Sequence, residues 1–314
     1  MISFGPVPSR RLGKSLGMNN IISPKVCSYG CVYCQAGKTT RKSIKRENFF
    51  KPEVVFEKVE QHIEKLSKEN YPDYLTFVSN GEPTLDINLG KAIELLKSLE
   101  IPIAVITNAS LLFNKQVRDD LNMADWVSLK MDAGDNDTWH KINRPAQGLN
   151  FEKIIESINL FADEYNGILC TETMLINEIN DTVDNITSVS ELVKRINPVK
   201  AYLAIPIRPP SEESVNPPDS EKLNMAWQIF NNNHINTEFL TGFEGTDTGF
   251  TGNIYEDILN ITAVYPLRQD SLIRLLWNDK ADIQVVKSLI KQRLIRSTTY
   301  NGNKYYLREY PLHI

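Results

Sequence analysis

The feature that most restricts the fold is a regular alternation of short apolar runs with longer amphipathic segments. The apolar runs are rich in Val, Ile, Leu and Thr, as strands are, and the segments between them repeat apolar residues with helical spacing. Strands separated by helices most often run parallel, which predicts an open α/β sheet or part of a (β/α) barrel. The expected strands are Tyr74–Asn80, Pro102–Asn108, Trp126–Asp132, Ile168–Ile176 and Val199–Ile207, and the expected helices are Val54–Leu66, Leu89–Leu99, Phe151–Tyr165 and Ile186–Ile196.

The expected strand Trp126–Asp132 has two unlike faces. Because successive side chains of a strand alternate, Ser128, Lys130 and Asp132 share one face, and the other face is apolar. A polar face on a helix-covered strand is tolerable only where it lines a cavity or finds partners. We expect this face to line the barrel interior, close to the carboxyl ends of the strands, where both architectures place their sites.

The pattern changes after residue 240. Residues 241–253 are rich in Gly and Thr, which fits a long loop or a domain boundary. The elements expected downstream have the order of a winged-helix-like module, namely helices Ser271–Trp277 and Asp282–Gln292, then strands Leu294–Tyr300 and Lys304–Arg308 around an Asn301-Gly302 turn. We expect a barrel over residues 1–240, a linker over 241–259 and a winged-helix-like domain over 260–314.

Composition argues against a membrane protein. The chain is 41% hydrophobic and 24% charged, and no apolar run approaches the roughly 20 residues that cross a bilayer. The first six residues have neither the basic nor the apolar region of an export signal, so we expect a cytoplasmic protein with no membrane partner. Charge is uneven: residues 1–51 carry ten Lys and Arg against one acid, and residues 260–314 carry nine against four. Solvated surface explains such regions as well as an interaction surface does.

Three of the four cysteines lie within eight residues. Cys27, Cys31 and Cys34 have CxxxCxxC spacing, and three soft thiolates on one short loop suit three corners of an iron–sulfur cube, with the fourth iron left open. A structural zinc site is the alternative, and it needs a fourth ligand such as His62, His140, His234 or His313. The remaining cysteine, Cys170, stands in an apolar strand and is expected to be buried as a small hydrophobe.

The cysteine spacing, with Tyr33 just before the last cysteine, resembles the signature of the radical S-adenosyl-L-methionine (SAM) superfamily. In that family the open iron binds the amino and carboxylate groups of SAM. The resemblance implies a partial (β/α)6 barrel, a [4Fe-4S] cluster on Cys27, Cys31 and Cys34, and SAM as a cofactor.

A second motif strengthens this resemblance. The sequence Gly81-Glu82-Pro83 follows the first expected strand, where family members carry a "GEP" motif whose acidic residue and backbone contact the SAM ammonium. By the same resemblance Asn108 is a candidate near the SAM ribose or methionyl group, and Lys130 is a candidate for the SAM carboxylate, although a substrate contact or a structural pair is equally open. The candidate cofactor-binding residues are Tyr33, Gly81, Glu82, Pro83, Asn108, Ser128 and Lys130.

The substrate candidates are basic or acidic side chains near the expected site. Arg208 closes the strand Val199–Ile207, where an arginine suits a phosphate or a carboxylate but also a surface cap. The set is Arg10, Arg11, Asp132 and Arg208.

Residues 1–240 resemble, more narrowly, a group described as wyosine-synthase-related, through the segment Phe4 to Gly17, the segment Ser79 to Thr84 and Arg208-Pro-Pro. The wyosine-type tRNA-modifying enzymes use a second cluster built on cysteines upstream of the first. This chain has no cysteine before Cys27, so the resemblance carries over the radical chemistry and not the pyruvate-condensing reaction.

The reaction implied by the resemblance is reductive cleavage of SAM to methionine and a 5′-deoxyadenosyl radical that abstracts hydrogen from a substrate, with flavodoxin or ferredoxin as the type of electron donor. RNA, such as tRNA, is one substrate class, favoured by the basic tail and a basic N-terminal region. A protein or peptide is the other, as in activases and maturases. A third hypothesis is an iron–sulfur or zinc sensor with a nucleic-acid-binding winged helix, which would not need the polar strand face. The N-terminal basic residues are Arg10, Arg11, Lys14, Lys38, Arg41, Lys42, Lys45 and Arg46.

Overall fold

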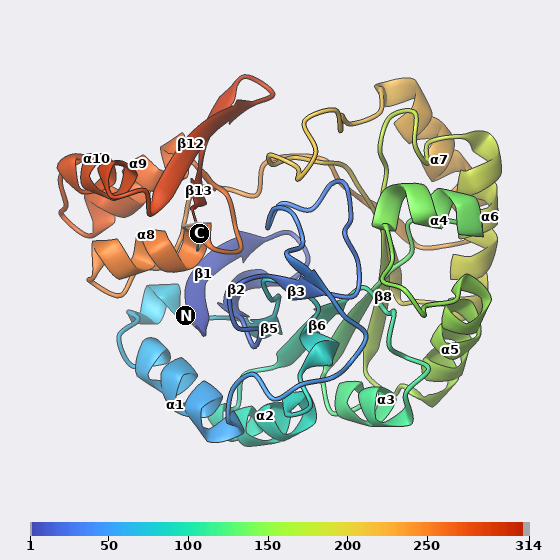
Figure 1. Ribbon diagram of the computed structural model, residues 1–314, viewed down its shortest axis with the longest axis horizontal. Helices are drawn as coiled ribbons and strands as arrows, with labels where there is room; N and C mark the ends of the chain where they lie inside the picture. The colour runs from blue at the N-terminus through green and yellow to red at the C-terminus, as the bar shows by residue number, and fades with distance from the viewer. Residues whose placement is uncertain (1, 310–314) are drawn as a thin grey trace.

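The computed structural model describes residues 2–309. Its centre is an eight-stranded sheet with the order β1-β2-β5-β6-β7-β8-β9-β10, in which β1 is antiparallel to β2 and every other pair is parallel. The sheet curls into an open barrel (Figure 1). The strands are β1 (Ser3–Ser9), β2 (Gly13–Met18), β5 (Tyr74–Phe77), β6 (Ile103–Thr107), β7 (Trp126–Lys130), β8 (Ile168–Met174), β9 (Lys200–Ala204) and β10 (Thr237–Leu240).

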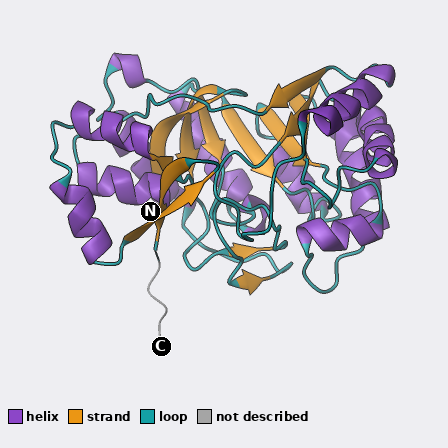
Figure 2. Ribbon diagram, turned by 90° about the horizontal axis from the view of Figure 1, so that it is seen from above, coloured by secondary structure: helices purple, strands orange, loops and turns teal. Residues whose placement is uncertain are grey.

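Helices cover the outer face of this sheet (Figure 2), one after each of β2 and β5 to β9. Asn150 and Thr182 begin two of them by accepting a hydrogen bond from a backbone N–H of the first turn. The partial (β/α)6 barrel predicted from the sequence is therefore confirmed. The covering helices are α1 (Pro52–Ile63), α2 (Leu89–Leu96), α3 (Lys115–Leu121), α5 (Phe151–Glu164), α6 (Val183–Ile196) and α7 (Ser220–Asn232), and the short elements between are β3 (Val26–Cys27), β4 (Arg41–Lys42), η1 (Lys68–Asn70), η2 (Pro83–Leu85), η3 (Lys97–Leu99) and α4 (Asn136–Asn143).

All five strands predicted from the sequence are present, each shorter than its apolar run. The sequence pattern does not predict β1, β2 or β10. Pro6 and Pro8 interrupt β1, and proline ordinarily indicates a turn; β1 lies at the edge of the sheet, where a missing N–H removes no interior ladder bond. The four-residue β10 forms the other edge.

The inner face of the sheet is partly filled by a small apolar cluster. Leu12, from the β1–β2 turn, packs there against side chains of five strands, while Val127 and Leu129 are fully buried on the opposite face of β7. The alternation predicted for β7 is thus observed, and the turn helps to close the interior. The cluster consists of Leu12, Ala104, Trp126, Cys170, Tyr202, Ala204 and Leu240.

The C-terminal elements form a second group. Its three-stranded sheet has the order β11-β13-β12, and Asn301 and Gly302 have φ of 46° and 73°, as a two-residue hairpin turn requires. The core of this group includes Phe4 and Val7, so it packs directly on β1. The domain boundaries remain a prediction, and residues of the expected linker belong to α8. The elements are α8 (Ile254–Thr262), β11 (Leu267–Arg268), α9 (Gln269–Asn278), α10 (Gln284–Lys291), β12 (Ile295–Tyr300) and β13 (Asn303–Arg308).

Within residues 2–309, none of the helices combines the length and the apolar character that crossing a bilayer requires.

Candidate active site

The three clustered cysteines lie on the loop that follows β2 at its carboxyl end. Backbone hydrogen bonds tie this loop to the end of α4, from Gly30 N to Asn143 O (2.9 Å) and from Val32 N to Ile142 O (3.0 Å). All three cysteines are free thiols of intermediate exposure. A loop anchored in this way presents its thiols in a defined arrangement.

Each thiol sulfur has a hydrogen-bond donor from a neighbouring segment. Lys25 Nζ lies 2.9 Å from Cys34 Sγ, and Asn143 Nδ2 lies 3.3 Å from Cys31 Sγ. The backbone N–H of Tyr29 (3.5 Å) and Asn108 Nδ2 (3.7 Å) approach Cys27 Sγ. Donors directed at sulfur stabilise the negative charge of thiolate ligands and influence the potential of an iron–sulfur cluster. The donor set therefore fits a cluster held by these cysteines.

The environment acts differently on the three thiols. Burial raises the pKa of Cys27 and raises that of Cys31 to about 12. Burial also opposes ionisation of Cys34, but the Lys25 ammonium beside its sulfur outweighs this effect, so the pKa of Cys34 is lowered. The buried thiols thus need positive charge to ionise, which bound iron supplies.

Among residues 2–309, the zinc alternative finds no fourth ligand. His62 is engaged through both ring nitrogens, with Ser3 Oγ and Gly5 O each at 3.0 Å, and His140 and His234 are exposed. Across residues 2–309, no group of three or more His, Cys, Asp or Glu side chains is placed to hold a single metal ion. Thiolates of an iron–sulfur cube each bind a different iron and need not converge on one point. His313 lies outside the described residues.

Gly81 brings the GEP segment against the start of the cysteine loop. It forms an isolated bridge with Val26, and Glu82 N donates to Val26 O (3.2 Å). Gly81 has φ of 145°, and a Cβ at this position would overlap the Val26 carbonyl oxygen. Only glycine allows this approach without displacing the residue before Cys27.

The buried carboxylate of Glu82 organises the neighbouring strand ends. Its Oε1 accepts hydrogen bonds from Thr84 N (3.1 Å), Thr84 Oγ1 (2.7 Å) and Thr107 Oγ1 (2.6 Å), and its Oε2 accepts one from Asn108 N (2.8 Å). Burial raises the pKa of Glu82. Because four donors occupy this carboxylate, its structural task is to join η2 to the end of β6.

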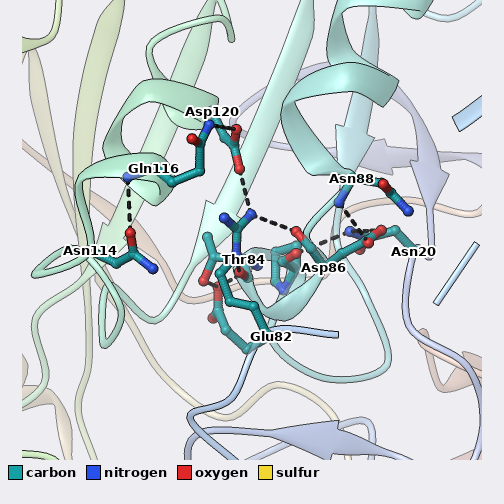
Figure 3. Close-up of polar contacts among 10 residues, drawn as sticks. Asn20, Glu82, Thr84, Asp86, Asn88, Asn114, Gln116 and Asp120 are labelled. Atoms are coloured by element: carbon teal, nitrogen blue, oxygen red, sulfur yellow. Dashed lines mark hydrogen bonds and ion pairs between the residues drawn. The ribbon is translucent and has the colours of Figure 1, made fainter. Parts of the chain in front are cut away.

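A second buried network, around Asn20 and Asp86, lies next to Glu82 (Figure 3), and the Pro83 carbonyl belongs to it. Asn20 Nδ2 donates to Pro83 O (3.0 Å) and to Asp86 Oδ2 (3.2 Å), and Asn88 N donates to Asp86 Oδ1 (3.0 Å). Burial raises the pKa of Asp86 to about 6. Sequence reasoning missed Asn20, whose position is set by long-range contacts.

Asn108 lies beside the cysteines, and its role near the ribose or methionyl group of SAM stays a prediction. Its Nδ2 donates to Ser28 Oγ (2.8 Å) in addition to approaching Cys27. Ser128 lies deeper in the barrel, is 1% exposed, and has an Oγ without a hydrogen-bond partner among the described residues. An unpaired buried hydroxyl on the inner face is suited to a polar group of a ligand.

Lys130 and Arg11 converge on one buried carboxylate inside the barrel. Both form ion pairs with Glu172 of β8, whose side chain is 5% exposed. Burial lowers the pKa of Lys130 and of Arg11. Sequence reasoning missed Glu172, although its alternation with Cys170 in the predicted strand places it on the inner face.

Tyr33 and Asp132 anchor the cysteine loop. The Tyr33 hydroxyl donates to Asp132, which also accepts from Asn143 Nδ2 (2.8 Å) and Met174 N (2.9 Å). Burial, followed by the Asp132 charge, raises the pKa of Tyr33 well above its usual value. Asp132 thus acts on Cys31 in two ways: its charge, after burial, helps to raise the pKa of Cys31, and it holds Asn143, which donates to the Cys31 sulfur.

The other two substrate candidates, Arg208 and Arg10, have different surroundings. Arg208 is buried in an ion pair with Glu244, lies over the Tyr265 ring at 3.9 Å, and donates to Gln35 Oε1 (3.3 Å) beside Cys34. Arg10 lies on the β1–β2 turn, where its Nη1 reaches Phe239 O at 3.5 Å. The fold brings Arg208 to the cysteine loop and leaves Arg10 elsewhere.

The chain is similar to several known proteins. A family model described as the radical SAM superfamily matches residues 21–187. UPF0026 protein MJ1312 of Methanocaldococcus jannaschii is 45% identical over 98% of this chain and 96% of its own length. A probable dual-specificity RNA methyltransferase RlmN of Streptococcus sanguinis is 23% identical over 62% of this chain and 56% of its own length.

Among solved structures, that of TYW1 with a lysine-pyruvate adduct bound superposes with a TM-score of 0.51 and 19% identity, covering 71% of this chain and 75% of the other. At this identity the likeness shows the fold alone. The matched family model includes the cysteine loop, the GEP segment and the polar strand β7. The chain therefore belongs to the radical SAM superfamily and is an enzyme of that class.

Proposed function

We propose that the chain reductively cleaves SAM at a cluster held by Cys27, Cys31 and Cys34, and that hydrogen is then abstracted from an RNA. Enzymes of this superfamily use a [4Fe-4S] cluster and SAM, which together supply 5′-deoxyadenosyl radical chemistry when bound. The observation that supports the proposal best is that each of the three sulfurs has its own hydrogen-bond donor.

The chain contributes orientation and charge. Lys25 and Asn143 direct positive charge or an N–H dipole at the sulfurs, which favours the reduced state of a bound cluster. Glu82 fixes the ends of two strands beside them. The apolar cluster around Leu12 excludes water from the inside of the barrel, which protects a reactive intermediate.

RNA is favoured by exposed cations next to the cysteine loop. The basic N-terminal region divides in the structure: Arg11 and Arg46 are buried in ion pairs, whereas cations of the loop itself are exposed. The RlmN relative is named as an RNA methyltransferase. The exposed set is Lys38, Arg41, Lys42 and Lys45.

Anaerobic reconstitution with iron and sulfide, reduction in the presence of SAM, and chromatography for 5′-deoxyadenosine test the SAM cleavage. Replacement of Cys27, Cys31 or Cys34 by alanine should abolish the product, and Cys170→Ala should retain it. Cleavage that survives in any of the three loop variants would contradict the proposed cluster site.

The RNA assignment needs a separate readout. Mixed tRNA should increase the 5′-deoxyadenosine yield of the reconstituted enzyme and acquire a nucleoside mass change. An increase that only a protein fraction produces would leave SAM cleavage intact and exclude RNA as the substrate.

A further inference from the structure

The segment that follows β9, residues 206–212, contacts the C-terminal hairpin. We call this segment the strap. The Tyr300 hydroxyl donates to Pro206 O (3.0 Å), and the Tyr305 hydroxyl donates to Ile207 O (2.9 Å). Both tyrosines belong to the β12–β13 hairpin, which is therefore seated on the first part of the strap.

The remainder of the strap contacts the cysteine loop. Ser211 Oγ donates to Cys31 O (2.9 Å), and Arg208 Nη1 donates to Gln35 Oε1 (3.3 Å). Glu212 N donates to Val32 O (3.1 Å). Arg208 is itself fixed by its buried ion pair with Glu244, so one short segment joins the hairpin to the loop that carries the thiols.

The length of the strap limits the distance between these two structures. Seven residues reach at most about 25 Å when fully extended. Surfaces that bind single-stranded nucleic acid cover roughly 4–16 nucleotides. One short stretch of RNA can therefore contact the hairpin and the cysteine loop at the same time.

Exposed cations lie on both sides of the strap. On the loop side, Lys38 is 75% and Arg144 48% exposed, with Glu212 as their shared counter-charge, and Lys42 is exposed beside Gly30. The loop side thus carries more positive than negative charge.

On the hairpin side, Arg296 is exposed. It lies four residues before Tyr300 in β12, so the two side chains share the face that is directed to the strap. Lys304 is also exposed, but it lies on the other face of β13 from Tyr305, over the Tyr306 ring, and is therefore directed away from the strap. Three positive groups on the loop side and one on the hairpin side of a short segment suit the regularly spaced phosphates of a nucleic acid.

We propose that the hairpin cation Arg296 and the loop cations Lys38 and Lys42 form one surface that binds the phosphate backbone of an RNA across the strap and directs it to the barrel mouth. This inference rests on the proposed RNA substrate. It assigns to the C-terminal hairpin the task of positioning that substrate.

The test uses the reconstituted full-length enzyme and mixed tRNA, with retention measured over a series of salt concentrations. The variant Lys38→Ala/Lys42→Ala removes two positive charges from the loop, and Arg296→Ala removes one from the hairpin. Lys91→Ala/Lys97→Ala, the α2 variant, removes two from α2 and the adjoining η3 on the outside of the barrel. Each loop or hairpin variant should lose at least roughly fivefold in affinity and reduce the salt slope by about 1 per phosphate contact removed. The α2 variant should match the wild type.

The possible outcomes distinguish a failure of the proposed surface from a failure of the proposed RNA substrate. SAM cleavage without RNA should be unchanged in the hairpin variant, which shows that the variant is folded and active. If the wild type retains tRNA and either the loop or the hairpin variant behaves like the α2 control, the shared surface is overturned while the RNA substrate stands. If the wild type fails to retain tRNA even at low salt, the RNA assignment itself fails.

Discussion

Gly81 and Val26 are in such close contact that the GEP segment and the cysteine loop have no room for a side chain between them. The two motifs are far apart along the chain, and a backbone contact at a single glycine brings them together in space. This relationship explains why the motif must contain glycine next to Glu82, independently of any ligand.

The first prediction concerns Gly81→Ala. The added methyl group overlaps the Val26 carbonyl, and φ of 145° is unfavourable for alanine, so the first cysteine should be displaced. Iron content after reconstitution and 5′-deoxyadenosine yield should fall roughly tenfold or more. Gly30→Ala is the matched control, because its Cβ would come close to the flexible end of Lys42 (3.0 Å) and otherwise make an ordinary contact with Arg144 Cβ (3.7 Å). Wild-type iron content in Gly81→Ala would contradict the contact.

Glu82→Gln should destabilise the folded protein. An amide replaces one acceptor oxygen by a donor, which then opposes the N–H of Asn108 or the donors of Thr84 and Thr107. An unsatisfied buried group costs about 1–3 kcal/mol, measurable by chemical denaturation. The same change at exposed Glu94, which pairs with Lys91, should leave the free energy of unfolding nearly unchanged. Equal losses at the two sites would argue against the network.

The ion pairs inside the barrel predict which of two substitutions lowers the free energy of unfolding more. Glu172→Gln leaves Arg11 and Lys130 buried without their carboxylate and should cost about 3–5 kcal/mol of unfolding free energy. Lys130→Met leaves Arg11 paired with Glu172, so its cost should be clearly smaller. Unfolding curves of the two variants measure this difference, and a larger loss in Lys130→Met would reverse the assignment.

His62 predicts a dependence of stability on pH. Burial lowers the pKa of His62, and its Nε2 is held as a donor by the Gly5 carbonyl while Nδ1 faces the Ser3 hydroxyl. The unfolded chain therefore binds a proton more readily, so stability from this residue is complete above about pH 6.5 and decreases as the pH falls toward the lowered pKa. His62→Gln should flatten this slope in denaturation measured from pH 5 to 7. An unchanged slope would show that His62 does not couple folding to protonation.

Local patterns account for a large part of the fold and the site. The spacing of Cys27, Cys31 and Cys34 depends only on neighbouring residues, and strand alternation is a property of each strand alone, so β7 and its inner face were predictable. Which charged side chains pair with one another was not predictable from local patterns. Arg11 and Arg46 look alike in a basic sequence region, but one pairs with Glu172 and the other with Asp120.

The sequence by itself determined the cysteine loop, the GEP segment, the five strands β5 to β9 and four of the helices that cover them, because short-range spacing encodes them. Only the tertiary structure decided that Glu82 is fully hydrogen-bonded, that Gly81 touches Val26, and that the strap joins the hairpin to the loop. These contacts join residues far apart along the chain, and their partners are selected by how the curled sheet brings strand ends together. No local pattern contains that information.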